Sequence, residues 1–137
     1  APGALSLLMA QRLIRKICND CALNTEEIQK LHPDIFTDKE NELKLMGINN
    51  SHETDSKIRF SNPEGCPKCN NKGEIGRKLV IEYIEITDTD REFILKGDME
   101  GWRKKLSENN FKSIESQLIN HVKSGIIDAS RATEQME

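Results

Sequence analysis

The sequence predicts an α+β fold, with a small tetracysteine subdomain of short β-strands flanked by an N-terminal helix and a C-terminal helical tail. Three observations support this. All four cysteines fall into two Cys-x-x-Cys pairs, CNDC at 18–21 and CPKC at 66–69. The run GRKLVIEYIEI at 76–86 is rich in β-branched residues, which is typical of a strand. Most other segments carry apolar residues at helical spacing.

Composition indicates a thin hydrophobic core. The 137 residues are 36% hydrophobic and 4% aromatic, with one Trp and one Tyr. A small domain with so few large side chains often needs a metal or a disulfide for stability. The net charge of −3 argues against nucleic acid as the main partner, because phosphate binding favours a basic face. No apolar run approaches the ~18–20 residues of a membrane-spanning helix.

Periodicity assigns the remaining elements. Residues 4–17 are expected to form a helix, because apolar residues recur at near-helical spacing from Leu5 to Ile17. The other expected helices, strands and turns follow from caps, glycines and prolines. They are helices over 24–32, 37–47, 90–97, 98–110, 113–125 and from 128 onward, strands over 57–60 and 76–86, a loop over 48–56 and a turn over 61–65.

Short basic clusters occur at 11–16 and 103–105. We interpret them as solvated helix faces, with a contact surface as the alternative. The chain starts with Ala-Pro-Gly rather than Met, and we expect it to be a piece of a longer protein.

The cysteine spacing favours a structural metal site. Each Cys-x-x-Cys pair can form a tight knuckle that presents two thiolates, and four thiolates complete a tetrahedron. Gly65, Pro67 and Gly73 supply the turns that such a knuckle needs. The predicted ligands are Cys18, Cys21, Cys66 and Cys69.

Two other interpretations of the cysteines stay open. Disulfides are disfavoured because no secretory signal indicates an oxidising compartment. A redox Cys-x-x-Cys normally lies where a helix begins, whereas the first pair here is expected to follow a helix. Zinc is favoured over iron because nothing in the sequence indicates electron transfer, although four thiolates also suit iron. The three histidines, His32, His52 and His121, are expected to take no part.

No catalytic centre is predicted. A Walker A loop is absent, since GEIGRK at 73–78 is too short and lacks the Ser or Thr. The paired carboxylates Glu26 and Glu27 lie where helix capping accounts for them.

Four stretches occur in an order that carries a resemblance: AQRLIRKICNDC at 10–21, GCPKCNNKGEIGR at 65–77, IEY at 81–83 and NFKSIESQLINHVKSGI at 110–126. Together they resemble the C-terminal part of the secretion-superfamily ATPases of type II secretion and type IV pilus assembly. The resemblance covers nearly the whole chain. It implies that the four cysteines complete a tetracysteine zinc subdomain.

Single residues also match the motifs of that family. Gly76 and Arg77 match its GR, Glu82 matches the glutamate of its IYE, and Gly125 matches a late glycine of its tail. The departures leave open whether the branch is secretion, pilus or conjugation. They are Glu74 in place of an aromatic residue, Leu79 in place of a small one, and Gln117-Leu118 in place of Asp-Gly.

The resemblance further implies a division of the chain and a parent activity. Residues 1–17 would be a helix leaving an absent ATPase core, 18–87 the zinc subdomain and 88–137 the helical region. The parent would be a cytoplasmic hexamer that hydrolyses ATP with Mg²⁺ through a loop upstream of this chain. The chain itself would not be an enzyme. Its partners would be the ATPase core, neighbouring subunits and an inner-membrane platform protein, which would make it peripheral at the inner membrane.

Three functions therefore compete. The first is a zinc-stabilised structural and interaction element of an assembly ATPase. The second is a stand-alone zinc-ribbon adaptor or nucleic-acid-binding module, in which Lys68, Lys72, Arg77 and Lys78 would meet phosphate. The third is a thiol-redox protein.

Overall fold

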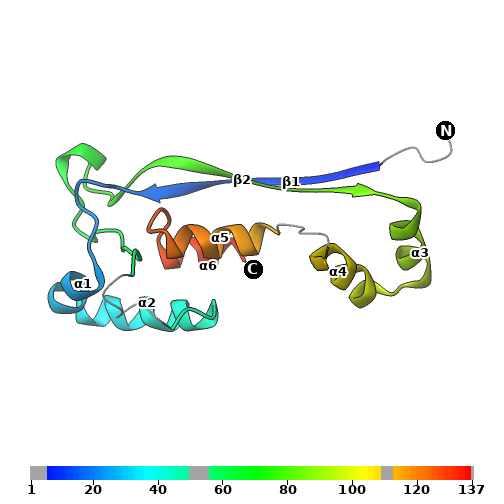
Figure 1. Ribbon diagram of the computed structural model, residues 1–137. Helices are drawn as coiled ribbons and strands as arrows, with labels where there is room; N and C mark the ends of the chain where they lie inside the picture. Colours follow the sequence, from blue (N-terminus) through cyan, green and yellow to red (C-terminus); the bar gives the residue numbers. More distant parts are fainter. Residues whose placement is uncertain (1–5, 50–55, 109–112, 137) are drawn as a thin grey trace. The chain divides into compact units, whose positions relative to one another are not determined.

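The computed structural model describes residues 6–49, 56–108 and 113–136 and confirms a mixed α+β fold (Figure 1). Its elements follow one another in the order β1 (Ser6–Ile17), α1 (Thr25–Leu31), α2 (Pro33–Leu45), the 3₁₀ turn η1 (Pro67–Cys69), β2 (Glu74–Ile86), α3 (Asp88–Lys96), α4 (Met99–Glu108), α5 (Ile114–Lys123) and α6 (Ala129–Gln135).

The expected N-terminal helix is wrong, because residues 6–17 form strand β1. Residues 4 and 5 of that expectation lie outside the described residues. β1 pairs with β2 in a two-stranded sheet whose strands run in opposite directions (Figure 1). Side chains alternate as strand geometry requires, with Leu13 and Arg15 exposed and Ile14 buried between them. The strand expected over 76–86 is confirmed as β2, which has 13 residues, and its partner β1 has 12.

Pairing with β2 explains why residues 6–17 form a strand and not the expected helix. Leu, Met, Ala, Arg and Lys have good intrinsic helix propensity, but such local preferences are weak and tertiary pairing overrides them. The strand expected over 57–60 is also wrong, because these residues form no strand. It contributes a single antiparallel bridge between Phe60 and Leu23, with N–H···O distances of 2.8 and 2.9 Å.

Local signals account for the helix boundaries. Asn24 caps α1 in a capping box with Glu27. Helix α2 begins at Pro33 rather than near residue 37, because proline at the first helical position has a preset φ and needs no amide partner. Thr87 caps α3 in a capping box with Asp90. The turn at 61–65 is confirmed, and residues 50–55 of the expected loop lie outside the described residues.

Backbone contacts divide the chain into two compact units. The larger one, here called the cysteine unit, comprises residues 13–80 and 115–137. The smaller one, called the hairpin unit, comprises residues 1–12 and 81–114.

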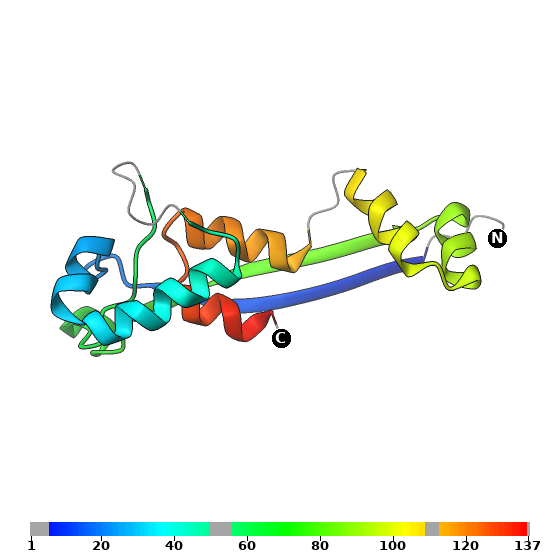
Figure 2. The ribbon, with the colours of Figure 1, turned by 90° about the horizontal axis from the view of Figure 1, so that it is seen from below.

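The cysteine unit has its own buried core. Helix α2 packs against α1 and α6, and Figure 2 shows α2 beside α6. The rings of Phe36 and Phe60 meet edge to face with centroids 6.2 Å apart. The largest fully buried apolar side chains of this unit are Phe60, Ile14, Ile28, Leu43, Leu118, Ile127, Val80 and Val122.

The hairpin unit depends on a small polar network. Helix α3 packs against α4, and Asp90 of α3 is 2% exposed. Its carboxylate accepts hydrogen bonds from the indole of Trp102 at 3.1 Å and the amine of Lys105 at 2.8 Å. These bonds satisfy a charge that burial would otherwise make costly. None of the helices in the described ranges is long and apolar enough to cross a bilayer.

Candidate metal centre

The first cysteine pair follows the end of strand β1. Cys18 is 1% exposed, and its amide donates to the carbonyl of Gly73 at 3.0 Å. Its own carbonyl accepts from the amide of Ala22 at 3.0 Å, which closes a turn over the pair. Two hydrogen bonds on one backbone unit therefore fix the direction in which this turn presents its thiols.

The second pair forms a tighter knuckle built on η1. The amide of Asn71 donates to the carbonyl of Cys66 at 2.8 Å, and Asn70 and Asn71 both adopt positive φ, 56° and 62°. Asparagine tolerates that conformation better than other residues with a side chain. A Cβ atom at Gly65 would lie 2.2 Å from the carbonyl carbon of Asn71, so only glycine lets the loop close.

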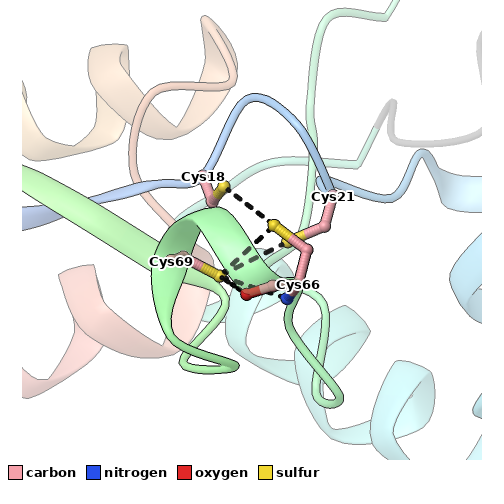
Figure 3. Close-up of side chains that lie close together, drawn as sticks. All are labelled: Cys18, Cys21, Cys66 and Cys69. Carbon is pink, nitrogen blue, oxygen red and sulfur yellow. Dashed lines mark hydrogen bonds between the residues drawn. The ribbon is translucent and has the colours of Figure 1, made fainter.

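The four sulfur atoms converge, as Figure 3 shows. The Sγ atoms of Cys18 and Cys66 are 3.7 Å apart, those of Cys21 and Cys69 are 3.8 Å apart, and those of Cys66 and Cys69 are 3.7 Å apart. All four lie within 4.8 Å of one another. The sequence prediction that two distant pairs come together is thus matched by the positions of the atoms.

These distances separate the competing interpretations. A disulfide needs sulfur atoms about 2.05 Å apart, and all four cysteines are free thiols. A tetrahedron with metal–sulfur bonds of about 2.3 Å has edges of about 3.8 Å. The three shortest sulfur–sulfur pairs, at 3.7 to 3.8 Å, match that length. The donor set therefore fits a four-coordinate ion with thiolate ligands, and the four cysteines could hold a metal ion.

Two backbone amides stabilise the ionised form of the Cys69 thiol. The amides of Cys66 and Gly73 lie 3.3 and 3.2 Å from Cys69 Sγ. Burial alone raises the pKa of Cys69, but these donors outweigh it and bring the pKa down to about 6. Burial, with hydrogen bonds from neighbouring thiols, raises the pKa of Cys21. Without a cation the cluster therefore does not favour four thiolates at once.

Neither His32 nor His121 belongs to the cysteine cluster. His32 occupies the junction of α1 and α2, and His52 lies outside the described residues. His121 on α5 is half-buried, and burial together with the charge of Lys78 lowers its pKa. Among the described residues, the four cysteines are the one group of three or more His, Cys, Asp or Glu side chains that could share an ion.

The expected helix before Cys18 is strand β1, so the position of the first pair after a helix does not count against a redox role. The sulfur atoms approach one another between the two motifs as closely as within one, with 3.7 Å for both Cys18–Cys66 and Cys66–Cys69. All four thiols therefore belong to one shared cluster.

Sequence reasoning missed two residues that hold the cluster in place. The guanidinium of Arg59 donates to the carbonyl of Gly125 at 2.9 and 2.7 Å and to the side chain of Asn19 at 2.8 Å. The carboxylate of Asp128 caps α6, accepts from the amide of Ser61 at 2.9 Å, and pairs with Lys39. The sequence predicted only that a helix begins at residue 128, because the partners of Arg59 and Asp128 are remote along the chain.

Comparison with known proteins identifies the family. The model of a family described as "Type II/IV secretion system protein" matches residues 2–136. The Type II secretion system ATPase E of Vibrio cholerae serotype O1 (strain ATCC 39315 / El Tor Inaba N16961) is 29% identical over 119 residues. That alignment covers 87% of this chain and 21% of the relative, so the chain spans about a fifth of the relative's length. The chain therefore belongs to the type II/IV secretion system protein family.

Proposed function

We propose that this chain is a zinc-stabilised structural and interaction element of a type II/IV secretion-system assembly ATPase. One observation carries the proposal, namely four free thiols whose sulfur atoms all lie within 4.8 Å of one another, with three pairs 3.7 to 3.8 Å apart. Cys18, Cys21, Cys66 and Cys69 would hold the ion through sulfur alone. Four protein ligands leave no open position for a substrate, which is typical of structural zinc rather than catalytic zinc.

The bound ion would connect two parts of the cysteine unit that are remote in sequence. Residues 22–65 lie between the two pairs and include α1 and α2. Because the site forms only when the chain folds, the free energy of metal binding adds to the stability of the folded chain, and structural zinc is worth about 10 kcal/mol of apparent binding free energy. The ion would thus supply stability that the aromatic-poor core does not.

The activity of the parent belongs to the same proposal. Family membership and the similarity to a secretion ATPase support a parent that hydrolyses ATP with Mg²⁺ as a hexamer. We assign the chain no turnover of its own, because the sequence holds no nucleotide-binding loop. Its partners would be its own ATPase core, neighbouring subunits and an inner-membrane platform protein. A cytoplasmic position, peripheral at the inner membrane, would follow from those partners.

Two measurements test this function. Elemental analysis should find one zinc per purified chain. One iron per chain would instead identify the ion as iron. An ATPase assay on the chain should read background. Turnover that is lost when a residue of this chain is substituted would refute its assignment as a non-catalytic element.

A further inference from the structure

A cation-lined cavity lies beside the second cysteine knuckle, within the cysteine unit. It has a volume of about 280 Å³, and four basic side chains line it: Arg15, Lys68, Lys72 and Arg77. Arg15 comes from β1, Arg77 from β2, and the two lysines from the knuckle and the residues after it. The lining is thus locally basic, although the net charge of the chain is −3.

Few counter-ions face these cations. The one carboxylate in the lining, Glu74, accepts two hydrogen bonds from Arg131, at 2.6 and 3.2 Å, and so is already compensated. Lys68 has an exposed pair with Asp20 at 3.3 Å. Within the described part of the chain, Arg15, Lys72 and Arg77 make no ion pair and no side-chain hydrogen bond. These three side chains are exposed, and Cys69, one of the predicted metal ligands, also lines the cavity. Several cations around one cavity raise the local concentration of ligands of opposite charge.

We propose that this cavity binds a phosphate group. Two guanidinium forks and two ammonium groups match the several acceptor oxygens of a phosphate, since arginine binds phosphate with two parallel hydrogen bonds. The exposed side chain of Ile75 in the lining offers apolar contact for the group that carries the phosphate. The proposal goes beyond the zinc assignment, because it concerns a second site with a different ligand.

A single phosphate group fits better than a polynucleotide. No aromatic side chain lines the cavity, whereas proteins that track single strands use aromatic rings to stack successive bases. The phosphate could belong to a soluble ester or to a phospholipid headgroup. Both present the same oxygens, and the experiment distinguishes them.

The zinc-loaded chain of 137 residues provides the test. Amide resonances would be followed by NMR during titration with inorganic phosphate and glycerol phosphate at constant ionic strength. Vesicles of phosphatidylglycerol and of phosphatidylcholine form the lipid arm. The variants are Arg77→Gln and Lys72→Gln, with Lys123→Gln on the exposed side of α5 as the matched control. Zinc content is measured in every sample, so failure of the metal assignment is seen separately.

Saturable shifts confined to Arg15 and residues 68–77 are expected. Phosphate affinity should fall about tenfold in Arg77→Gln and change less than twofold in Lys123→Gln. A response to glycerol phosphate assigns a soluble ester. A response to phosphatidylglycerol alone, lost in Arg77→Gln, assigns a headgroup.

Three results would overturn the proposal. The first is the absence of any saturable shift with phosphate or with either kind of vesicle. The second is equal affinity in the Arg77→Gln and Lys123→Gln chains. The third is loss of zinc from the Arg77→Gln and Lys72→Gln chains, because their cations would then serve to balance the negative charge of a zinc centre with four thiolates.

Discussion

The amide of Gly73 lies 3.2 Å from the sulfur of Cys69, and the carbonyl of the same Gly73 accepts the amide of Cys18 at 3.0 Å. One residue thus contacts both cysteine pairs through its backbone. Its φ is +79°, and a Cβ atom there would lie 2.4 Å from the carbonyl oxygen of Asn62. The position therefore requires glycine for its conformation and for its space.

Substituting Gly73 by alanine should weaken metal binding at least tenfold. The left-handed conformation costs a residue with a Cβ about 1–2 kcal/mol, and the contact with Asn62 adds to that by moving the loop. Gly47→Ala is the matched control, because Gly47 has a φ of +78° and open space around it. Competition with a zinc-binding dye measures both variants. Equal losses of zinc affinity in the two variants would show that the contact between a Cβ at position 73 and the carbonyl oxygen of Asn62 does not affect the metal site.

Replacing Asp128 by asparagine should destabilise the cysteine unit by about 3–5 kcal/mol, because it leaves the half-buried ammonium of Lys39 without its charge partner. Urea unfolding followed by circular dichroism measures the change. Asp38→Asn, at an exposed site on α2, should cost less than about 0.5 kcal/mol. Adding Lys39→Met to Asp128→Asn should restore part of the loss. If Lys39→Met restores no stability, the loss in Asp128→Asn does not come from the unpaired charge of Lys39.

Acid should destabilise the hairpin unit between pH 4 and pH 2. Burial alone raises the pKa of Asp90, but hydrogen bonds from Lys105 and Thr87 bring it down to about 2, against an ordinary value of 3.8. The unfolded chain therefore takes up this proton at a higher pH than the folded chain does. The ionised carboxylate contributes about 2 kcal/mol above pH 4, and this is lost as the pH falls through 2.

Emission from Trp102, the single tryptophan, reports this transition directly, since its indole donates to Asp90. Asp90→Asn should remove the dependence on pH over this range and lower stability at neutral pH. Asp88→Asn is the control, because the Asp88 side chain is 80% exposed in its pair with Arg91. An unchanged acid profile in Asp90→Asn would contradict the assignment.

Removing the metal should partly unfold the cysteine unit. A strong chelator, or Cys66→Ser, takes away the link between the two ends of residues 22–65. Loss of helical circular dichroism and a lower thermal midpoint are expected, with recovery when zinc is restored to the chelated chain. Unchanged thermal stability after verified removal of metal would mean that the ion does not hold this unit together.

Local chemistry made the cysteine cluster and most helices predictable. The two Cys-x-x-Cys pairs, the Asn24 cap and the glycines after helices are short-range signals that depend on few neighbours. The strand β1 was not predictable in this way. Its residues favour a helix locally, and its partner β2 lies more than 50 residues further along the chain.

The other contacts that the sequence did not predict join residues that are remote along the chain. Arg59 and Gly125, or Lys39 and Asp128, are ordinary residues in the sequence and acquire their roles only when the chain folds. The cavity beside the second knuckle also depends on residues that are remote in the sequence. The notion that Lys68, Lys72 and Arg77 could meet phosphate came from the sequence, but Arg15 joins them only because β1 is a strand beside β2.

X-ray absorption at the zinc edge, combined with elemental analysis of the purified chain, tests the central claim most directly. We predict one zinc per chain, surrounded by four sulfur atoms at about 2.3 Å. A chain free of zinc after expression in zinc-supplemented medium, or a zinc shell containing nitrogen or oxygen, would contradict a site formed by Cys18, Cys21, Cys66 and Cys69.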